Sequence, residues 1–177
     1  MHPDDHNSNP HALPGPPVGA VSVWVLVAFV GLCLLVGAAG GVVTAPGVRG
    51  WYLSLARPPG TPPNWLFAPV WTTLYVMMGV AAWLVWRATY GGLAGRPALR
   101  LWGWQLLVNA VWSPVFFALH STGWALLVIV VLLGLIGFTL RAFLRVQAWA
   151  GLLLMPYLAW VCYATYLNAG FWWLNPA

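Results

Sequence analysis

Five long apolar runs without a charged residue constrain the fold of this 177-residue chain more than any other feature. A transmembrane helix needs about 20 mostly apolar residues, and a segment in lipid must satisfy its backbone hydrogen bonds internally. The runs are continuous rather than alternating in polarity, which argues against membrane strands. We therefore expect an all-α membrane protein, a five-transmembrane-helix bundle, with spans at residues 20–43, 65–86, 101–119, 122–140 and 149–170.

The segments outside these runs define the domain organisation. Residues 1–19 are polar and rich in Pro and His, so we expect a disordered N-terminal tail. Residues 44–64 form a long loop rich in Pro and Gly, with a short patch around Trp51 and Tyr52 that is typical of a membrane interface. The membrane domain is therefore expected at residues 20–175.

The distribution of charge excludes several classes of protein. Charged residues make up 5% of the chain, against roughly 25% in soluble domains, which excludes a soluble globular protein. The basic residues are Arg side chains scattered singly between apolar runs, so a nucleic-acid-binding module is not expected. Positive-inside logic places the N-terminus in the cytoplasm of a bacterial inner membrane. The Arg residues on the N-terminal side are Arg87, Arg96, Arg100, Arg141 and Arg145, and those on the other side are Arg49 and Arg57.

Neutral polar and aromatic side chains recur at helical spacing within three of the runs. Gln105 and Asn109 are four residues apart and share one helix face. Stripes of this kind suit a flat, apolar, aromatic ligand with polar edges. They are equally compatible with interfacial anchoring and with hydrogen bonds between helices. The stripes are Trp71, Tyr75 and Met78; Gln105, Asn109, Trp112, Ser113 and Phe116; and Tyr157, Trp160, Ala164, Leu167 and Asn168.

The ionisable residues argue against other chemistry. An ion pump needs carboxylates within the membrane, and the two acidic residues, Asp4 and Asp5, lie in the tail. Nucleophilic catalysis needs a base beside a Ser or Cys, and the single His outside the tail, His120, falls in an expected hairpin. We therefore expect no conventional catalytic site, no metal site and no required cofactor.

Several motifs resemble the TspO/MBR family of tryptophan-rich sensory proteins and translocator proteins. Residues 51–58 (WYLSLARP), 61–67 (TPPNWLF) and 71–75 (WTTLY) look like its first loop and second helix. Gln105, Asn109, Trp112 and Pro114 look like its third helix, and residues 156–160 (PYLAW) like its fifth. The resemblance extends from Ala20 to Asn175.

The resemblance implies a function that the residue pattern alone leaves open. It implies a homodimer that binds protoporphyrin IX or haem, and also isoquinoline carboxamide and benzodiazepine-type drugs, under loop 44–64 as a lid. A sensor, regulator or carrier is the first hypothesis; light- or oxygen-dependent degradation of bound porphyrin and a purely structural scaffold are the alternatives. The candidate ligand-binding residues are Trp51, Trp65, Phe67, Trp71, Tyr75, Gln105, Asn109, Trp112, Phe116, Trp160, Ala164 and Leu167.

Two departures from the family pattern stand out. Pro59 and Gly60 replace an aromatic residue that many relatives carry in the lid. The cholesterol motif of animal relatives needs a Tyr and a basic residue where this chain has Ala169 and Trp173. We therefore do not expect cholesterol binding through that motif.

Overall fold

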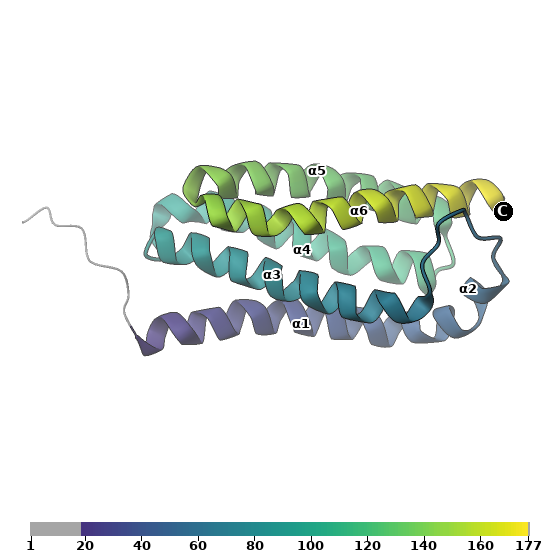
Figure 1. Cartoon of the computed structure of the whole chain (residues 1–177), viewed down its shortest axis with the longest axis horizontal. Helices are drawn as coiled ribbons and strands as arrows, with labels where there is room; N and C mark the ends of the chain where they lie inside the picture. The colour runs from purple at the N-terminus through teal and green to yellow at the C-terminus, as the bar shows by residue number, and fades with distance from the viewer. Residues whose placement is uncertain (1–18, 177) are drawn as a thin grey trace, which may run out of the picture.

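A computed structural model describes residues 19–176, which form a bundle of long helices (Figure 1). The described residues contain no strand, which confirms the all-α membrane fold. The long helices are α1 (Ala20–Arg49), α3 (Phe67–Ala88), α4 (Arg96–Phe117), α5 (Thr122–Val146) and α6 (Ala148–Leu174). The shorter elements are α2 (Trp51–Ser54) and the 3₁₀ turns η1 (Asn64–Leu66) and η2 (Leu93–Gly95). The expected tail, residues 1–19, lies outside the described residues except for Gly19.

Several helices have the length and composition of membrane spans, so the chain is an integral, multi-pass membrane protein. Four segments meet both criteria: Val21–Arg49, Asn64–Ala88, Thr122–Val146 and Ala148–Leu174. Helix α4 is as long as α3, but Arg96, Arg100, Gln105 and Asn109 make it less apolar. The five-span count therefore stays a prediction.

The helices differ from the expected spans at their ends: most are longer, but α3 begins at Phe67 rather than at residue 65 and α4 ends at Phe117 rather than at residue 119. Helix α1 continues past Val43 to Arg49, although it contains Pro46. Helix α4 begins at Arg96 rather than at Leu101, with Pro97 in its first turn, where a missing N–H costs no hydrogen bond. These Arg side chains mark helix ends rather than loops, because a long side chain at a helix end can carry its charge to the membrane surface. The loop expected at 44–64 is correspondingly shorter.

The bundle packs α5 against both α4 and α6, while α1 lies on one side against α3 and α4 (Figure 1). The contact between α1 and α3 is close at Gly79, where an added Cβ would lie 2.6 Å from Val30 Cα. The main buried cluster is built from all five long helices and includes Met78, Ile129 and Tyr157, all at most 1% exposed. This core fixes the relative positions of α1, α3 and α4.

A loop that we call the strap (residues 55–63) crosses to the C-terminal part of α6. Ala56 donates its N–H to Asn175 Oδ1 at 2.9 Å, and Asn175 Nδ2 donates to the Ala56 carbonyl at 3.0 Å. The Tyr166 hydroxyl donates to the carbonyl of Pro59 at 3.0 Å. The Tyr163 hydroxyl, also from α6, donates to the carbonyl of Gly60. At Pro59 and Gly60 the strap is therefore held through its backbone.

Candidate ligand-binding cavity

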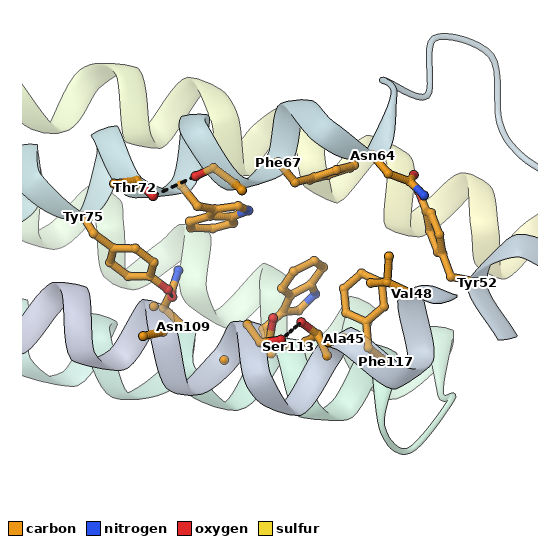
Figure 2. Close-up of a pocket in the computed structure, with 18 of the residues that line it drawn as sticks. Ala45, Val48, Tyr52, Asn64, Phe67, Thr72, Tyr75, Asn109, Ser113 and Phe117 are labelled. Atoms are coloured by element: carbon orange, nitrogen blue, oxygen red, sulfur yellow. Dashed lines mark hydrogen bonds between the residues drawn. The ribbon is translucent and has the colours of Figure 1, made fainter. Parts of the chain in front are cut away.

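A cavity of about 620 Å³ lies between α1, α3 and α4, at the end of the bundle that carries the strap (Figure 2). It extends from Tyr75 and Asn109 at its inner end to Tyr52 and Asn64 at its mouth. The volume falls in the range of roughly 300–1,000 Å³ that is typical of small-molecule sites. Its lining residues are Leu34, Gly37, Ala38, Gly40, Gly41, Thr44, Ala45, Val48, Arg49, Tyr52, Asn64, Phe67, Ala68, Trp71, Thr72, Tyr75, Asn109, Trp112, Ser113 and Phe117.

A buried hydrogen-bond network closes the inner end of the cavity. The Tyr75 hydroxyl donates to Asn109 Oδ1 at 2.7 Å, and Asn109 Nδ2 donates to the Tyr157 hydroxyl at 3.0 Å. Tyr157 donates in turn to Gln105 Oε1 at 2.9 Å, and Gln105 Nε2 lies 3.7 Å from the sulfur of Met78. Because each side chain holds its neighbour, Asn109 presents a fixed carboxamide to the cavity.

The two long walls differ in chemistry. Aromatic rings from α3 and α4 form one side, with the Trp71 and Tyr75 centroids 5.6 Å apart and the ring planes at 32°. The α1 wall consists mostly of small residues, and the Tyr75 ring packs directly on it at Gly37, where an added Cβ would lie 2.5 Å from Tyr75 Cε2. An aromatic wall that faces a smooth wall of small residues leaves a slot suited to a flat apolar molecule.

Tyr52 and Arg49 give the mouth of the cavity its polarity. Tyr52 is 3% exposed, and burial raises the pKa of its hydroxyl, while the Arg57 guanidinium, 5.5 Å from the Tyr52 ring centroid, opposes that shift. Arg49 is exposed and is the one charged side chain among the residues that line the cavity. The mouth is therefore cationic, whereas the interior is neutral.

The cavity is also open along the seam between α1 and α3. Leu34, Ala38 and Gly41 of α1 line it and are exposed, and so are Ala68 and Thr72 of α3. The hydroxyl of Thr72 is occupied by a hydrogen bond to the Ala68 carbonyl at 2.8 Å, so the seam is apolar in character. These residues belong to helices of membrane-spanning length.

Five of the twelve candidate residues come together in the cavity: Phe67, Trp71 and Tyr75 from α3, and Asn109 and Trp112 from α4. Gln105 lies directly behind them, 1% exposed in the hydrogen-bond network. Trp71, Tyr75, Gln105, Asn109 and Trp112 belong to the helical stripes found in the sequence, whereas Phe67 comes from the family resemblance.

The remaining candidates lie elsewhere. Trp160 lies behind Phe67, with ring centroids 6.2 Å apart, and its buried indole N–H has no partner among the described residues. Ala164 packs on the main core, and Phe116 and Leu167 belong to a second buried cluster around Tyr52. The Phe67 ring of α3 thus stands between Trp160 and the cavity, while Leu167 packs beside Tyr52.

Two tryptophans of the first loop also lie outside the cavity. Trp65 is 72% exposed. Trp51 stacks on His120, with ring centroids 4.6 Å apart, beside a second and more open cavity of about 650 Å³. This second cavity is lined mainly from α5, α6 and the adjoining loops.

The α1 wall and the mouth contribute lining residues that the sequence interpretation did not select. Small residues recur on α1 as Gly37, Gly41, Thr44 and Ala45, a spacing that places them on one helix face. That spacing was visible in the sequence and could have indicated a surface that accepts a flat ligand. Arg49 and Asn64 carried no comparable signal.

Comparison with known proteins identifies the family. The model of the TspO/MBR family matches residues 29–174. The chain belongs to the TspO/MBR family. It is similar to the tryptophan-rich protein TspO of Chlorobaculum tepidum, with 41% identity over 87% of this chain and 98% of the relative. It is also similar to protein CrtK of Rhodobacter capsulatus, with 39% identity over 81% and 88%, and to the human translocator protein, with 39% over 73% and 77%.

Membership of the TspO/MBR family confirms the resemblance drawn from the motifs in the first loop and in the helices. The matched region contains α3 and α4 in full and therefore all five candidate residues that line the cavity. Among the described residues, no group of three or more His, Cys, Asp or Glu side chains could hold a metal ion. The aromatic, small and neutral polar residues of the lining suit a ligand that is held by shape, stacking and hydrogen bonds.

Proposed function

We propose that the cavity binds a tetrapyrrole, protoporphyrin IX or haem, and that the protein acts as a sensor, regulator or carrier of that ligand. The observation that carries the proposal is the slot between Trp71 and the small residues of α1, which Tyr75 closes at its inner end by packing on Gly37. A flat macrocycle gains stacking on one side and close van der Waals contact on the other. The fixed Asn109 carboxamide supplies a polar contact at the inner end.

The chemistry of the lining favours recognition of the macrocycle rather than of a central metal. No His or Cys lines the cavity, and the described His120 lies at the second cavity instead. Protoporphyrin IX and haem would therefore be held through the same apolar faces. Isoquinoline carboxamide drugs, which are also flat and aromatic, would compete for the same slot.

We also propose that α4 crosses the membrane as the fifth span, with the N-terminus in the cytoplasm. Its 22 residues extend roughly 33 Å, enough to cross the hydrocarbon core, and its polar Gln105 and Asn109 are buried against neighbouring helices. The helix ends that carry Arg87, Arg96 and Arg145 lie together at one end of the bundle (Figure 1). Positive-inside logic makes that end cytoplasmic.

A titration with protoporphyrin IX tests the binding proposal. Quenching of tryptophan fluorescence and the shift of the porphyrin absorption band are followed in lipid nanodiscs. Ala45→Phe fills the slot from the α1 wall and is expected to weaken binding about 5- to 150-fold, since a buried overlap of this size costs about 1–3 kcal/mol. The matched control, Val42→Phe, lies one turn earlier on α1, is 76% exposed and does not line the cavity, so its affinity should equal that of the wild type.

The outcomes separate the proposal from its rivals. Equal affinity for Ala45→Phe and the wild type would place the ligand elsewhere. No saturable binding at all would favour the scaffold hypothesis. If illumination of the bound porphyrin gives a new absorbing product that neither Ala45→Phe nor an unrelated membrane protein gives, the degradation hypothesis gains support over simple binding.

A further inference from the structure

Arg49 occupies a distinctive position in the cavity. It lies in the last turn of α1, is exposed, and lines the mouth beside Val48 and Tyr52. Figure 2 shows Val48, Tyr52 and Asn64 gathered at this end, opposite Tyr75 and Asn109. The cavity therefore has a cation at one end and a neutral amide and phenol at the other.

Nothing in the described protein neutralises this cation. The only acidic residues of the chain, Asp4 and Asp5, lie outside residues 19–176, so the described part holds no carboxylate side chain. The other polar side chains of the lining are neutral, and Thr44 already donates its hydroxyl to the Gly41 carbonyl at 3.2 Å. An anionic group at the mouth would therefore find Arg49 as its one charged partner within the lining.

The cavity is long enough for a flat ligand inside it to reach Arg49 at the mouth. From Leu34 to Arg49, both of which line it, α1 rises roughly 22 Å at about 1.5 Å per residue. A long flat body can therefore lie along α1 while a group on its edge reaches the mouth. Guanidinium groups bind carboxylates through paired N–H donors and retain their charge at any physiological pH.

We propose that Arg49 makes the cavity selective for flat apolar ligands that carry a carboxylate at one end, so that the propionate edge of a tetrapyrrole lies at the mouth and its apolar edge lies against Tyr75 and Asn109. The inference rests on the proposed tetrapyrrole site and sets the orientation of the ligand within it. It also implies discrimination against esterified or decarboxylated forms of the same ring.

The test compares protoporphyrin IX with its dimethyl ester, which keeps the ring and removes both charges. Wild-type protein in nanodiscs of uncharged phosphatidylcholine should bind the acid more tightly than the ester by about three- to tenfold when each affinity is expressed as a mole fraction of ligand in lipid. The free energy that corresponds to this preference lies between that of a typical exposed ion pair and that of a hydrogen bond to a charged group. The preference should shrink as salt is raised, because Arg49 is exposed.

Variants assign the preference to this side chain. Arg49→Gln should lose the preference and bind acid and ester alike, whereas Arg49→Lys should keep part of it, since the charge remains but the paired donors do not. Arg145→Gln is the control for net charge: it removes an exposed Arg from the last turn of α5, which contributes no residue to the cavity. Its preference should match the wild type.

Each result bears on a different statement. If the wild type binds acid and ester equally, or if Arg49→Gln keeps the full preference, the role of Arg49 is refuted while the tetrapyrrole site stands. If Arg49→Gln weakens acid and ester equally, Arg49 acts only on the structure of the mouth, and the selectivity is again refuted. If the wild type binds neither compound saturably, the proposed function itself fails, and the inference fails with it.

Discussion

Replacing Tyr157 by Phe removes one hydroxyl from the centre of the bundle and should destabilise it measurably. The hydroxyl accepts from Asn109 at 3.0 Å and donates to Gln105 at 2.9 Å, so Tyr157→Phe leaves a buried amide N–H and a buried amide oxygen each without this partner. Gln105 is 1% exposed and does not line the cavity, so water does not replace its lost bond, whereas Asn109, 4% exposed, borders the cavity and is less completely shielded.

The expected magnitude follows from the two bonds. Hydrogen bonds between helices in membranes contribute about 0.6 kcal/mol on average and up to about 1.7 kcal/mol. In a soluble core an unsatisfied buried group costs about 1–3 kcal/mol. The two bonds together therefore give a loss of about 1–3 kcal/mol in the free energy of unfolding. The greater hydrophobicity of Phe does not compensate for this loss of stability, because the polar amides of Asn109 and Gln105 remain buried beside it.

Reversible unfolding in mixed micelles of increasing dodecyl sulfate content measures the change, with helical circular dichroism as the signal. Tyr166→Phe is the control: it also removes a tyrosine hydroxyl from α6, but that side chain is 51% exposed and makes a single bond to the strap. It should change stability by less than about 0.5 kcal/mol. If the two variants lose the same small amount, the network does not stabilise the fold and the reasoning is wrong.

Three further perturbations test other parts of the structure. Gly37→Ala places a methyl 2.5 Å from an aromatic ring carbon and should cost about 1–3 kcal/mol in the same unfolding assay, whereas Gly41→Ala, with nothing within 4 Å, should be close to neutral. Asn175→Ala breaks both bonds to Ala56 and should increase hydrogen exchange of strap amides, and unchanged exchange would show that the strap is held otherwise. Burial raises the pKa of the Tyr52 hydroxyl, so the folded state disfavours its ionised form. The free energy of unfolding should therefore be independent of this group below about pH 10, the usual tyrosine value, and should fall above it. In Tyr52→Phe the free energy of unfolding should fall less at alkaline pH.

The part of the site that the sequence predicted lies on helices with two chemically different faces. In α3 and α4, aromatic and polar residues at i and i+4 separate from the surrounding aliphatic residues, so Trp71, Tyr75, Asn109 and Trp112 were found together. Helical periodicity alone defines such a face, and packing leaves that face toward the cavity.

The α6 stripe shows where periodicity stops being informative. Trp160 and Leu167 share a face of α6, but periodicity does not say which helix covers that face. In the fold, the Phe67 ring lies against Trp160, and Leu167 packs beside Tyr52. The same residue pattern thus forms an interface between helices in α6 and a cavity wall in α4.

The sequence interpretation missed the strap contacts and the α1 wall for different reasons. The bonds between Ala56 and Asn175 join residues 119 positions apart, and no local pattern encodes such a pairing. Helix α1 is apolar all round, so it offers no contrast between faces, and only the small size of its residues distinguishes the cavity side. Its extension to Arg49 depends on tolerating Pro46 near the helix end.

The open seam between α1 and α3 affects how any affinity must be expressed. A ligand that reaches the cavity through exposed apolar residues such as Leu34 and Ala38 is drawn from the bilayer as well as from water. The chemical potential of the ligand then depends on its partitioning between water and lipid, and an apolar porphyrin concentrates strongly in lipid. Adding lipid at constant protein dilutes the ligand within the membrane phase and weakens the apparent binding without any change at the site. Dissociation constants for this protein are therefore comparable only as mole fractions of ligand in lipid.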